Sequence, residues 1–370
     1  MSGTGKKTRN RPDHDGSHRV QFERNKKKIY ATQTVCGICG NPVDFSLKFP
    51  HPLSPCIDHI IPIAKGGHPS DIDNLQLAHF CCNRQKSDKL EIDGEAAFGQ
   101  WFDLYSFLAN QGLVTIMPSP INKEGLADHV YAANSGIMIK DTYIVSNFTS
   151  EPRIPETAVI EQFMKTTGCK VVVCPFKFEG EADMKSIGFI DGKETYIGGY
   201  GMRSTKEAYE WMEKEFDIRV IKVKVKDEKL YHLDCSIFPL INYNEKNEGE
   251  NKKANILCCT EVFSENDVKE IRKYCKIIDV PLKLAYYGAT NCVRVGSSVL
   301  CGSDFYDLDP VEDAEFYFTE RDKNQWLEDV LGEYGFEVMF FNLSEFAKAG
   351  ACLSCNICHL NRYSYTIETV

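Results

Sequence analysis

Two pairs of candidate metal ligands limit what the N-terminal quarter of this chain can fold into. The pairs are Cys36 with Cys39 and His79 with Cys82, and two residues separate the members of each pair. Four ligands arranged in this way are typical of a closed structural zinc site. A unit this small buries little apolar surface, so it needs the stabilisation that a bound metal provides. Cys81 is a competing ligand, but it does not keep the two-residue separation.

Acid, imidazole and amide side chains accompany these ligands. Asp58 and His59 are adjacent, and Asn83 directly follows Cys82. Metal-dependent hydrolysis requires a base that activates water and a cation that stabilises the developing negative charge. The imidazole of His59 suits the base, because it titrates near neutral pH, and the oxygens of Asp58 and Asn83 suit Mg²⁺ or Mn²⁺. These residue types predict a catalytic metal beside a structural zinc.

Residues 33–90 resemble the HNH endonuclease family. The resemblance rests on four motifs, namely Cys36-Gly-Ile-Cys39, Asp58-His59-Ile-Ile-Pro62, Asn74-Leu75, and His79-x-x-Cys82-Asn83 followed by Lys86. It implies a small zinc-stapled ββα nuclease domain over residues 31–90, with His59 as the base and Asn74 as the brace of the loop that carries it. The alternative is a zinc knuckle that binds nucleic acid without cutting it.

Charge divides the chain at about the same place. Residues 1–90 hold 14 Lys and Arg against 8 Asp and Glu, a net charge of +6, and the remainder holds 29 against 45, a net charge of −16. A basic head on an acidic body indicates that the head makes any contact with DNA. Residues 1–30 are basic and almost without apolar residues, which predicts a disordered arm that follows phosphates or, equally, a solvated tail without a partner.

The sequence has no signal peptide and no apolar run long enough for a membrane span. It therefore predicts an intracellular, soluble, cytoplasmic protein without a membrane partner. Its 16 cysteines are dispersed over a long chain, which favours thiols and metal ligands over disulfides.

After residue 112 a ββαβ pattern recurs at intervals of roughly 50 to 60 residues, the range typical of rings and arrays. Hairpins are expected to begin near residues 136, 186, 235, 292 and 352, helices at 156–166, 205–216, 264–275 and 322–334, and further strands from 170, 219, 281 and 337. The fifth hairpin lacks a helix and a final strand. A helix at 95–110, within a connecting segment 91–112, and a strand at 113–117 would complete it. We therefore expect an α+β protein in which residues 113–370 form a closed ring of five ββαβ blades.

Acid, imidazole and thiol groups fall into the connections that enter the hairpins of this ring. The residues are Asp128, Glu179 with Glu181, His232 with Asp234, and Cys355. Because these connections emerge at one face of such a ring, the side chains are expected to converge there.

Residues 113–370 also resemble the guanidino-group modifying superfamily, which includes dimethylarginine dimethylaminohydrolase, arginine deiminase and the amidinotransferases. The resemblance rests on ADHVYAANSG at 127–136, FEGEAD at 178–183, GGYGMRST at 198–205, YHLD at 231–234 and AKAGACLSC at 347–355. It implies a five-bladed β/α propeller in which Cys355 is the nucleophile and His232 the general acid and base. It further implies that Glu179, Asp128 and Asp234 hold a cationic guanidinium, that Asn134 lines the site and that Arg203 binds a substrate carboxylate.

This chain departs from the superfamily pattern at two places. Ala182 stands where a glycine is usual, with Glu181 competing with Glu179 for the acid role, and the glycine-rich run before the nucleophile is Ala-Gly-Ala-Cys. A metal cluster of Cys352, Cys355, Cys358 and His359 is an alternative for the C-terminal thiols.

The sequence as a whole predicts a bifunctional hydrolase, a DNA endonuclease joined to a cysteine-dependent hydrolase of an arginine-like guanidine. The alternatives are a nuclease with a catalytically dead, ligand-sensing second domain, and an amidinotransferase or hydrolase with a zinc-knuckle DNA-binding module.

Overall fold

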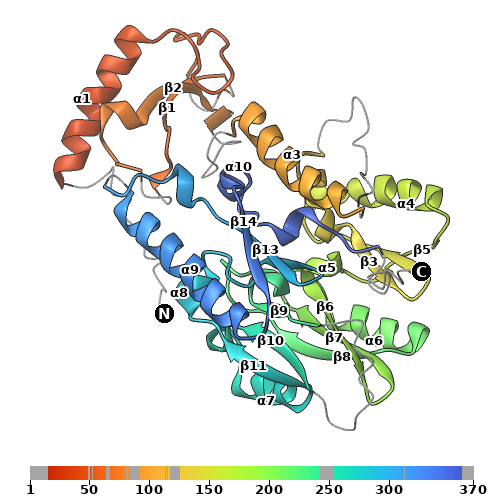
Figure 1. The fold of residues 1–370 in the computed structure, drawn as a ribbon. Coiled ribbons are helices and arrows are strands. Elements are labelled where there is room, and N and C mark those ends of the chain that lie inside the picture. Colours follow the sequence, from red (N-terminus) through yellow and green to blue (C-terminus); the bar gives the residue numbers. More distant parts are fainter. Residues whose placement is uncertain are drawn as a thin grey trace, which may run out of the picture. The chain divides into compact units, whose positions relative to one another are not determined.

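The computed structural model divides the chain into two compact units, Met1–Gly94 and Glu95–Val370, and each is described by itself (Figure 1). The structure describes residues 16–48, 51, 53–63, 67–80, 82–83, 92–112, 114, 116, 126–241, 253–311 and 313–360. Cys81 and Lys86 lie outside this range.

The first unit is built on a two-stranded antiparallel sheet. Strand β1 (Pro55–His59) pairs with β2 (Leu75–His79), with Pro55 opposite His79 and His59 opposite Leu75. The short helix η3 (Ile72–Asn74) leads into β2. Phe80, Cys82 and Asn83 are helical, and the residues that follow them lie outside the described range.

A helix stands where a disordered arm was expected. Helix α1 (Gly16–Thr32) covers the second half of the expected arm, and residues 1–15 lie outside the described range. Phe22, Asn25 and Ile29 turn inward from it at the three- and four-residue spacing of one helix face. Ile29 packs with Leu75 and Leu77 of β2, and this tertiary contact stabilises the helix. The basic composition of the segment gives no sign of these few inward-facing residues.

Four consecutive segments of the second unit have the same architecture. In each, two antiparallel strands form a hairpin, a helix follows, and a last strand runs parallel to the second strand of the hairpin. The first is β3 (Gly136–Ile139), β4 (Thr142–Val145), α4 (Glu156–Thr166) and β5 (Lys170–Val173); the second is β6 (Met184–Ile190), β7 (Lys193–Tyr200), α6 (Lys206–Phe216) and β8 (Arg219–Lys224); the third is β9 (Ile237–Pro239), β10 (Ala254–Cys258), α7 (Glu265–Tyr274) and β11 (Cys275–Asp279); the fourth is β12 (Cys292–Val295), β13 (Ser298–Gly302), α9 (Ala314–Gly332) and β14 (Glu337–Phe341).

These helices lie around the outside of the second unit, with the strands inside them (Figure 1). Short helices join the segments: η4 (Ala127–Val130), η5 (Ala132–Asn134), α5 (Gly180–Asp183), η7 (Leu233–Cys235), α8 (Leu282–Ala285), α10 (Ser344–Lys348) and η10 (Ser354–Asn356).

The recurring pattern is confirmed for these four segments, with two local errors. The strand expected from Pro281 is instead the short helix α8, and the parallel strand of that segment is β11, which begins directly after α7 ends. Helix α9 begins at Ala314, eight residues before the position expected.

The closed ring of five blades is wrong. The described part of the second unit contains four three-stranded sheets, and the fifth hairpin is missing, because Cys352 is in no strand and Ser354–Asn356 forms η10. Most of the expected strand at 113–117 lies outside the described residues. Helix α3 (Gly94–Asn110) is present, but Leu104 packs it onto Val293 and Leu300 of the fourth sheet, so it belongs to the second unit.

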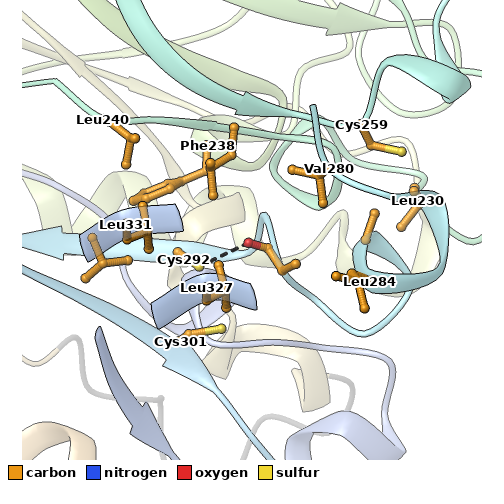
Figure 2. Packing of buried hydrophobic residues seen from close by; sticks show 14 residues of the cluster. Leu230, Phe238, Leu240, Cys259, Val280, Leu284, Cys292, Cys301, Leu327 and Leu331 are labelled. Atoms are coloured by element: carbon orange, nitrogen blue, oxygen red, sulfur yellow. Dashed lines mark hydrogen bonds between the residues drawn. The ribbon is translucent and has the colours of Figure 1, made fainter. Parts of the chain in front are cut away.

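Helix α9 of the fourth segment packs against residues of the third segment. Leu327 and Leu331 of α9 pack with Phe238 and Leu240, which come from the third segment (Figure 2). Cys259, Cys292 and Cys301 lie in the same cluster as small buried side chains.

Candidate functional sites in the two units

The four predicted zinc ligands come together in the first unit. One ligand atom each from Cys36, Cys39, His79 and Cys82 lies within 4.8 Å of the other three. His79 ends β2, and Cys82 follows one helical turn later, so the sheet places both of them opposite the Cys36–Cys39 turn.

The imidazole of His79 is oriented for this role. Its Nε2 donates to the carbonyl of Pro42 at 3.2 Å, while its Nδ1 lies 3.4 Å from Cys39 Sγ and 3.8 Å from Cys82 Sγ. A carbonyl partner on the remote nitrogen fixes the tautomer that leaves the other nitrogen to a metal. Three thiols and one imidazole fit Zn²⁺.

His59 lies at the end of β1 and is held on two sides. Its Nε2 donates to the carbonyl of Pro69 at 3.0 Å, and the ring of Phe22 stacks on the imidazole at 5.7 Å. Asn25 Nδ2 donates to the carbonyl of Ser70, the next residue, at 2.9 Å. Helix α1, which the sequence did not predict, therefore supports both the imidazole and the segment that binds it.

Asn74 spans the loop that follows His59. Its Oδ1 accepts from the backbone N–H of Ile61 at 2.7 Å, and its Nδ2 donates to the carbonyls of Ile61 and His68, both at 3.0 Å. These three bonds join the two ends of the loop. Gly67 permits this arrangement, because a Cβ there would lie 1.9 Å from the carbonyl oxygen of Ile61.

Asp58 and Asn83 lie at the same strand. Asp58 is buried and its Oδ2 accepts from Gln76 Nε2 at 2.8 Å, while Asn83 Nδ2 donates to the carbonyl of Ile57 at 3.1 Å. The Asp58 carboxylate belongs to β1 and the Asn83 amide contacts the neighbouring residue of that strand, and oxygens of both kinds suit a hard divalent cation.

In the second unit, Glu179, His232 and Asn134 form one hydrogen-bonded group. His232 Nε2 donates to Glu179 Oε2 at 2.8 Å, and Asn134 Nδ2 lies 3.3 Å from the same nitrogen. These residues lie immediately before the second, third and first hairpins. Gly180, at φ +65°, makes this approach possible, since a Cβ there would lie 2.4 Å from the carbonyl oxygen of Ala133.

The charges of this group favour an imidazolium and a carboxylate. Burial alone would lower the pKa of His232, but the carboxylates of Asp183 and Glu179 outweigh it and raise that pKa. Burial opposes ionisation of Glu179, but the hydrogen bond from His232 lowers its pKa. A histidine whose pKa is raised in the folded state stabilises the fold at pH values below the pKa of the unfolded state. This contribution is lost as the pH rises through the pKa of the folded state.

Cys355 lies in η10 beside a second group. Asn291 Nδ2 donates to Cys355 Sγ at 3.8 Å, and Asn291 Oδ1 accepts from the N–H of Ser354 at 2.7 Å. Ser354 Oγ donates to Asp234 Oδ2 at 2.7 Å. Because Asp234 follows His232 by two residues, it connects the segment of Cys355 to the group that contains His232.

The Cys355 thiol is protonated at neutral pH. Burial and then the negative charge of Asp234 raise its pKa to about 12. We predict that Asp234→Asn lowers this pKa and so speeds alkylation of Cys355 by neutral iodoacetamide about tenfold at pH 8, because about 1.4 kcal/mol of charge interaction equals one pKa unit. The rate is followed by peptide mass spectrometry. Asp217→Asn, at an exposed carboxylate, is the control, and an unchanged rate in Asp234→Asn would contradict the charge effect.

Asp128 and Arg203 lie at the margin of these groups. Burial raises the pKa of Tyr131, and the nearby Asp128 and Cys355 add to the increase. The guanidinium of Arg203 lies 4.9 Å from the centre of the Tyr231 ring, and its charge contributes to lowering the pKa of Glu179.

Two residues of these groups were missed by sequence reasoning. Asp183 is buried beside His232, accepts from Ser204 Oγ at 2.6 Å, and has a pKa raised to about 6 by burial. It closes the FEGEAD motif, which is the signal that could have found it. Asn291 lies in a turn after α8 and belongs to none of the motifs.

Glu179 was expected to hold the guanidinium, but in the structure its carboxylate binds groups of the protein. Its Oε1 accepts from the N–H of Thr149 at 3.1 Å and its Oε2 from His232, so protein groups contact both oxygens. Glu181 is directed elsewhere and binds His359. No group of three or more thiol, imidazole or carboxylate ligands at metal-binding distance, other than the zinc set, occurs among the described residues, which leaves the cluster proposed for Cys352, Cys355, Cys358 and His359 without support.

Comparison with known proteins identifies both units. A model of the HNH endonuclease family matches residues 36–89. Over 266 residues, 70% of this chain, the sequence is 27% identical to the bifunctional arginine dihydrolase/ornithine cyclodeaminase AgrE of Nostoc sp.. Over 146 residues, 40% of this chain, it is 27% identical to the N(G),N(G)-dimethylarginine dimethylaminohydrolase of Mycobacterium tuberculosis.

A solved structure has the same fold as the second unit. The product-bound N-terminal domain of ArgZ, an arginine dihydrolase from cyanobacteria, superposes with a TM-score of 0.59 at 24% identity, covering 73% of this chain and 88% of that domain. The chain spans 33% of AgrE and 46% of the mycobacterial enzyme.

Each unit therefore has a known structural counterpart. The chain carries an HNH domain at residues 36–89, and its remainder has the fold shared by dimethylarginine dimethylaminohydrolase, ArgZ and AgrE. This is a propeller-like fold of ββαβ units, here with four sheets in the described part. None of the described helices is both long and apolar enough to cross a bilayer.

Proposed function

We propose that the second unit is a cysteine-dependent hydrolase of an arginine-like guanidine. The observation that carries the proposal is that two hydrogen-bonded groups from separate segments meet where His232 and Asp234 lie two residues apart. The first group joins Glu179 to His232, and the second links Cys355 through Asn291 and Ser354 to Asp234. The relatives named above as arginine dihydrolase and dimethylarginine dimethylaminohydrolase act on such groups. A variant of the ArgZ domain was solved covalently bonded to a reaction intermediate, which supports covalent chemistry.

In this reaction the Cys355 thiol passes its proton to water, and the resulting thiolate Sγ attacks the guanidinium carbon to form the C–S bond. His232 protonates the departing nitrogen, the C–N bond breaks, and ammonia or an amine leaves behind a thiouronium. Water, deprotonated by His232, then adds to the same carbon and the C–S bond breaks. The products are a urea derivative and the regenerated thiol.

The remaining groups receive roles from their positions. Glu179 binds the Nε2–H of His232, which leaves Nδ1 as the nitrogen for proton transfer. Asp128 and Asp234 hold the cationic guanidinium by charge-assisted hydrogen bonds. Its positive charge beside Cys355 favours the thiolate, so the substrate offsets the raised thiol pKa. Asn134 lines the site, and Arg203 binds a substrate carboxylate.

The test is an assay of arginine and its N-methylated forms for a ureido product such as citrulline. Ureido product from one of them names the substrate. Transfer of the amidine to an added amine, without ureido product, would favour an amidinotransferase. Binding of a guanidine without turnover and without a Cys355 adduct would favour a ligand-sensing unit.

We propose that the first unit is a metal-dependent DNA endonuclease. Three observations support this: the zinc-ligand group, the bond from Asn83 to the carbonyl of Ile57, next to Asp58 in β1, and the orientation of His59 by Pro69. Mg²⁺ or Mn²⁺ on Asp58 and Asn83 would neutralise charge on the scissile phosphate. His59 activates water through Nδ1, because Nε2 binds a carbonyl. Exposed Arg19, Arg24, Lys27 and Lys28 of α1 supply phosphate contacts.

We predict that His59→Ala reduces metal-dependent nicking of supercoiled plasmid by at least about 100-fold, because a positioned general base contributes about 10² to 10⁴. Conversion to open-circular DNA is measured on gels with Mg²⁺ or Mn²⁺ and with a chelator. His51→Ala is the matched control, since His51 is exposed in the same unit. Undiminished nicking by His59→Ala would refute the base assignment, and zinc-dependent DNA binding without nicking by the wild type would favour the zinc-knuckle alternative.

A further inference from the structure

Glu181 is a buried carboxylate that the proposed reaction does not use. It lies in α5 between Glu179 and Asp183, with 3% of its side chain exposed. Its Oε2 accepts from His359 Nδ1 at 2.8 Å and from the backbone N–H of His359 at 3.3 Å. A carboxylate is buried at a high cost in solvation unless such bonds compensate for it, so this contact is specific.

The contact is made by the segment that carries the nucleophile. His359 follows Cys355 by four residues, and 24% of its side chain is exposed. Between them, Cys358 Sγ lies 3.4 Å from Tyr143 Oη and 3.7 Å from the carbonyl of Gly136. The segment is therefore tied to β3 and β4 at Cys358 and to α5 at His359.

The nucleophile needs such a tie because no strand holds it. Cys355 lies in the three-residue helix η10, where the fifth hairpin was expected, so no ladder of backbone hydrogen bonds fixes its position. Glu179 and Asp183, which lie beside His232, flank Glu181 in the chain. A bond from Glu181 to His359 therefore fixes the nucleophile segment against the element that holds the imidazole partner.

We propose that Glu181 and His359 form a latch that positions Cys355 Sγ relative to His232 and the bound guanidine. The latch acts through the backbone, so both residues are positioning residues that do not touch the substrate. The proposal rests on the hydrolase function proposed above. It also accounts for the acid in FEGEAD that sequence reasoning set in competition with Glu179.

Two substitutions separate the hydrogen bond from the space that the ring fills. His359→Phe keeps a ring and removes the donor, whereas His359→Asn places its amide nitrogen near the position of Nδ1. We expect His359→Phe to lower kcat about 10- to 100-fold with KM within about threefold, since a misplacement of about 1 Å costs up to about 10² in rate. His359→Asn is expected to recover most of the loss.

A double-mutant cycle tests whether the two residues act as one. Glu181→Met removes the acceptor at similar length, and the double variant with His359→Phe should be no slower than the slower single variant. Thermal unfolding of each variant is the control for folding. Losses that multiply, or that follow the change in Tm, would show a merely structural role.

A second readout does not depend on catalysis. Cys355 is only partly exposed, so release of the latch should speed its alkylation by neutral iodoacetamide at least about fivefold in His359→Phe and less in His359→Asn, while turnover falls. An unchanged alkylation rate overturns the latch. Faster alkylation in a protein whose wild type turns over no guanidine would uphold the latch and reject the hydrolase.

Discussion

Replacing Cys355 by alanine is expected to abolish ureido product, with a loss of at least about 10³-fold in kcat. Covalent catalysis depends on a nucleophile that no neighbouring group replaces, and removal of such a group costs about as much as removal of its whole constellation. The reaction is measured by colorimetric or chromatographic detection of the product from arginine and its N-methylated forms.

Cys352→Ala is the matched control for this result. Cys352 precedes Cys355 by three residues, and its N–H donates to Cys355 Sγ at 3.5 Å. Burial is the largest cause that raises the pKa of the Cys352 thiol. Cys355 adds to this increase and Lys323 opposes it. Cys352→Ala is expected to retain activity within about tenfold. The reverse order, with activity lost in Cys352→Ala and kept in Cys355→Ala, would assign the nucleophile to Cys352.

Replacing Cys39 by serine is expected to remove the bound zinc and unfold the first unit while the second unit stays folded. Structural zinc contributes about 10 kcal/mol or more to small domains, which equals or exceeds the whole stability of a typical domain. Zinc content is measured by elemental mass spectrometry, and folding of each unit by limited proteolysis with mass mapping of the fragments.

Cys56→Ser is the control for this substitution, because Cys56 lies in the same unit but outside the four-ligand group. It is expected to keep one zinc per chain. A chelator should reproduce the effect of Cys39→Ser, more readily at low pH, where protons compete for the thiolates and the imidazole. Full zinc content and unchanged proteolysis of Cys39→Ser would show that the group is not a zinc site.

The metal ligands and the ββαβ pattern could be predicted from sequence because each follows from local spacing. Two-residue separations place Cys36 with Cys39 and His79 with Cys82 on single turns, and the structure brings the two pairs together. Helix α7 was similarly clear, since Ser264 and Asp267 form a capping box at its start.

The predictions of secondary structure were wrong where contacts between residues far apart in the chain determine the local conformation. Helix α7 passes into β11 without an intervening turn residue, so the strand at Cys275–Asp279 was hidden and the next apolar run was taken for it. Helix α1 depends on three inward residues within a basic segment. The fifth hairpin was inferred from symmetry, but Gly350 at φ +84° turns the chain and η10 follows.

The sequence predicted which residues lie near one another better than it predicted the hydrogen bonds between them. The repeat placed Glu179 and His232 before hairpins, and the structure brings these two together. Cys355 was expected at a fifth hairpin, which the described residues do not form. Hydrogen bonds between segments far apart in the chain determine which acid serves which group, so the distinction between Glu179 and Glu181 required the structure.

The most direct test of the account is to map where an electrophilic amidine such as 2-chloroacetamidine labels the intact protein. A cationic amidine mimics a guanidinium and is expected to alkylate Cys355 selectively, at least about tenfold faster than neutral 2-chloroacetamide, with labelling slowed by arginine. Label on other thiols in proportion to their exposure, with no preference for the cationic reagent, would contradict a guanidine site at Cys355.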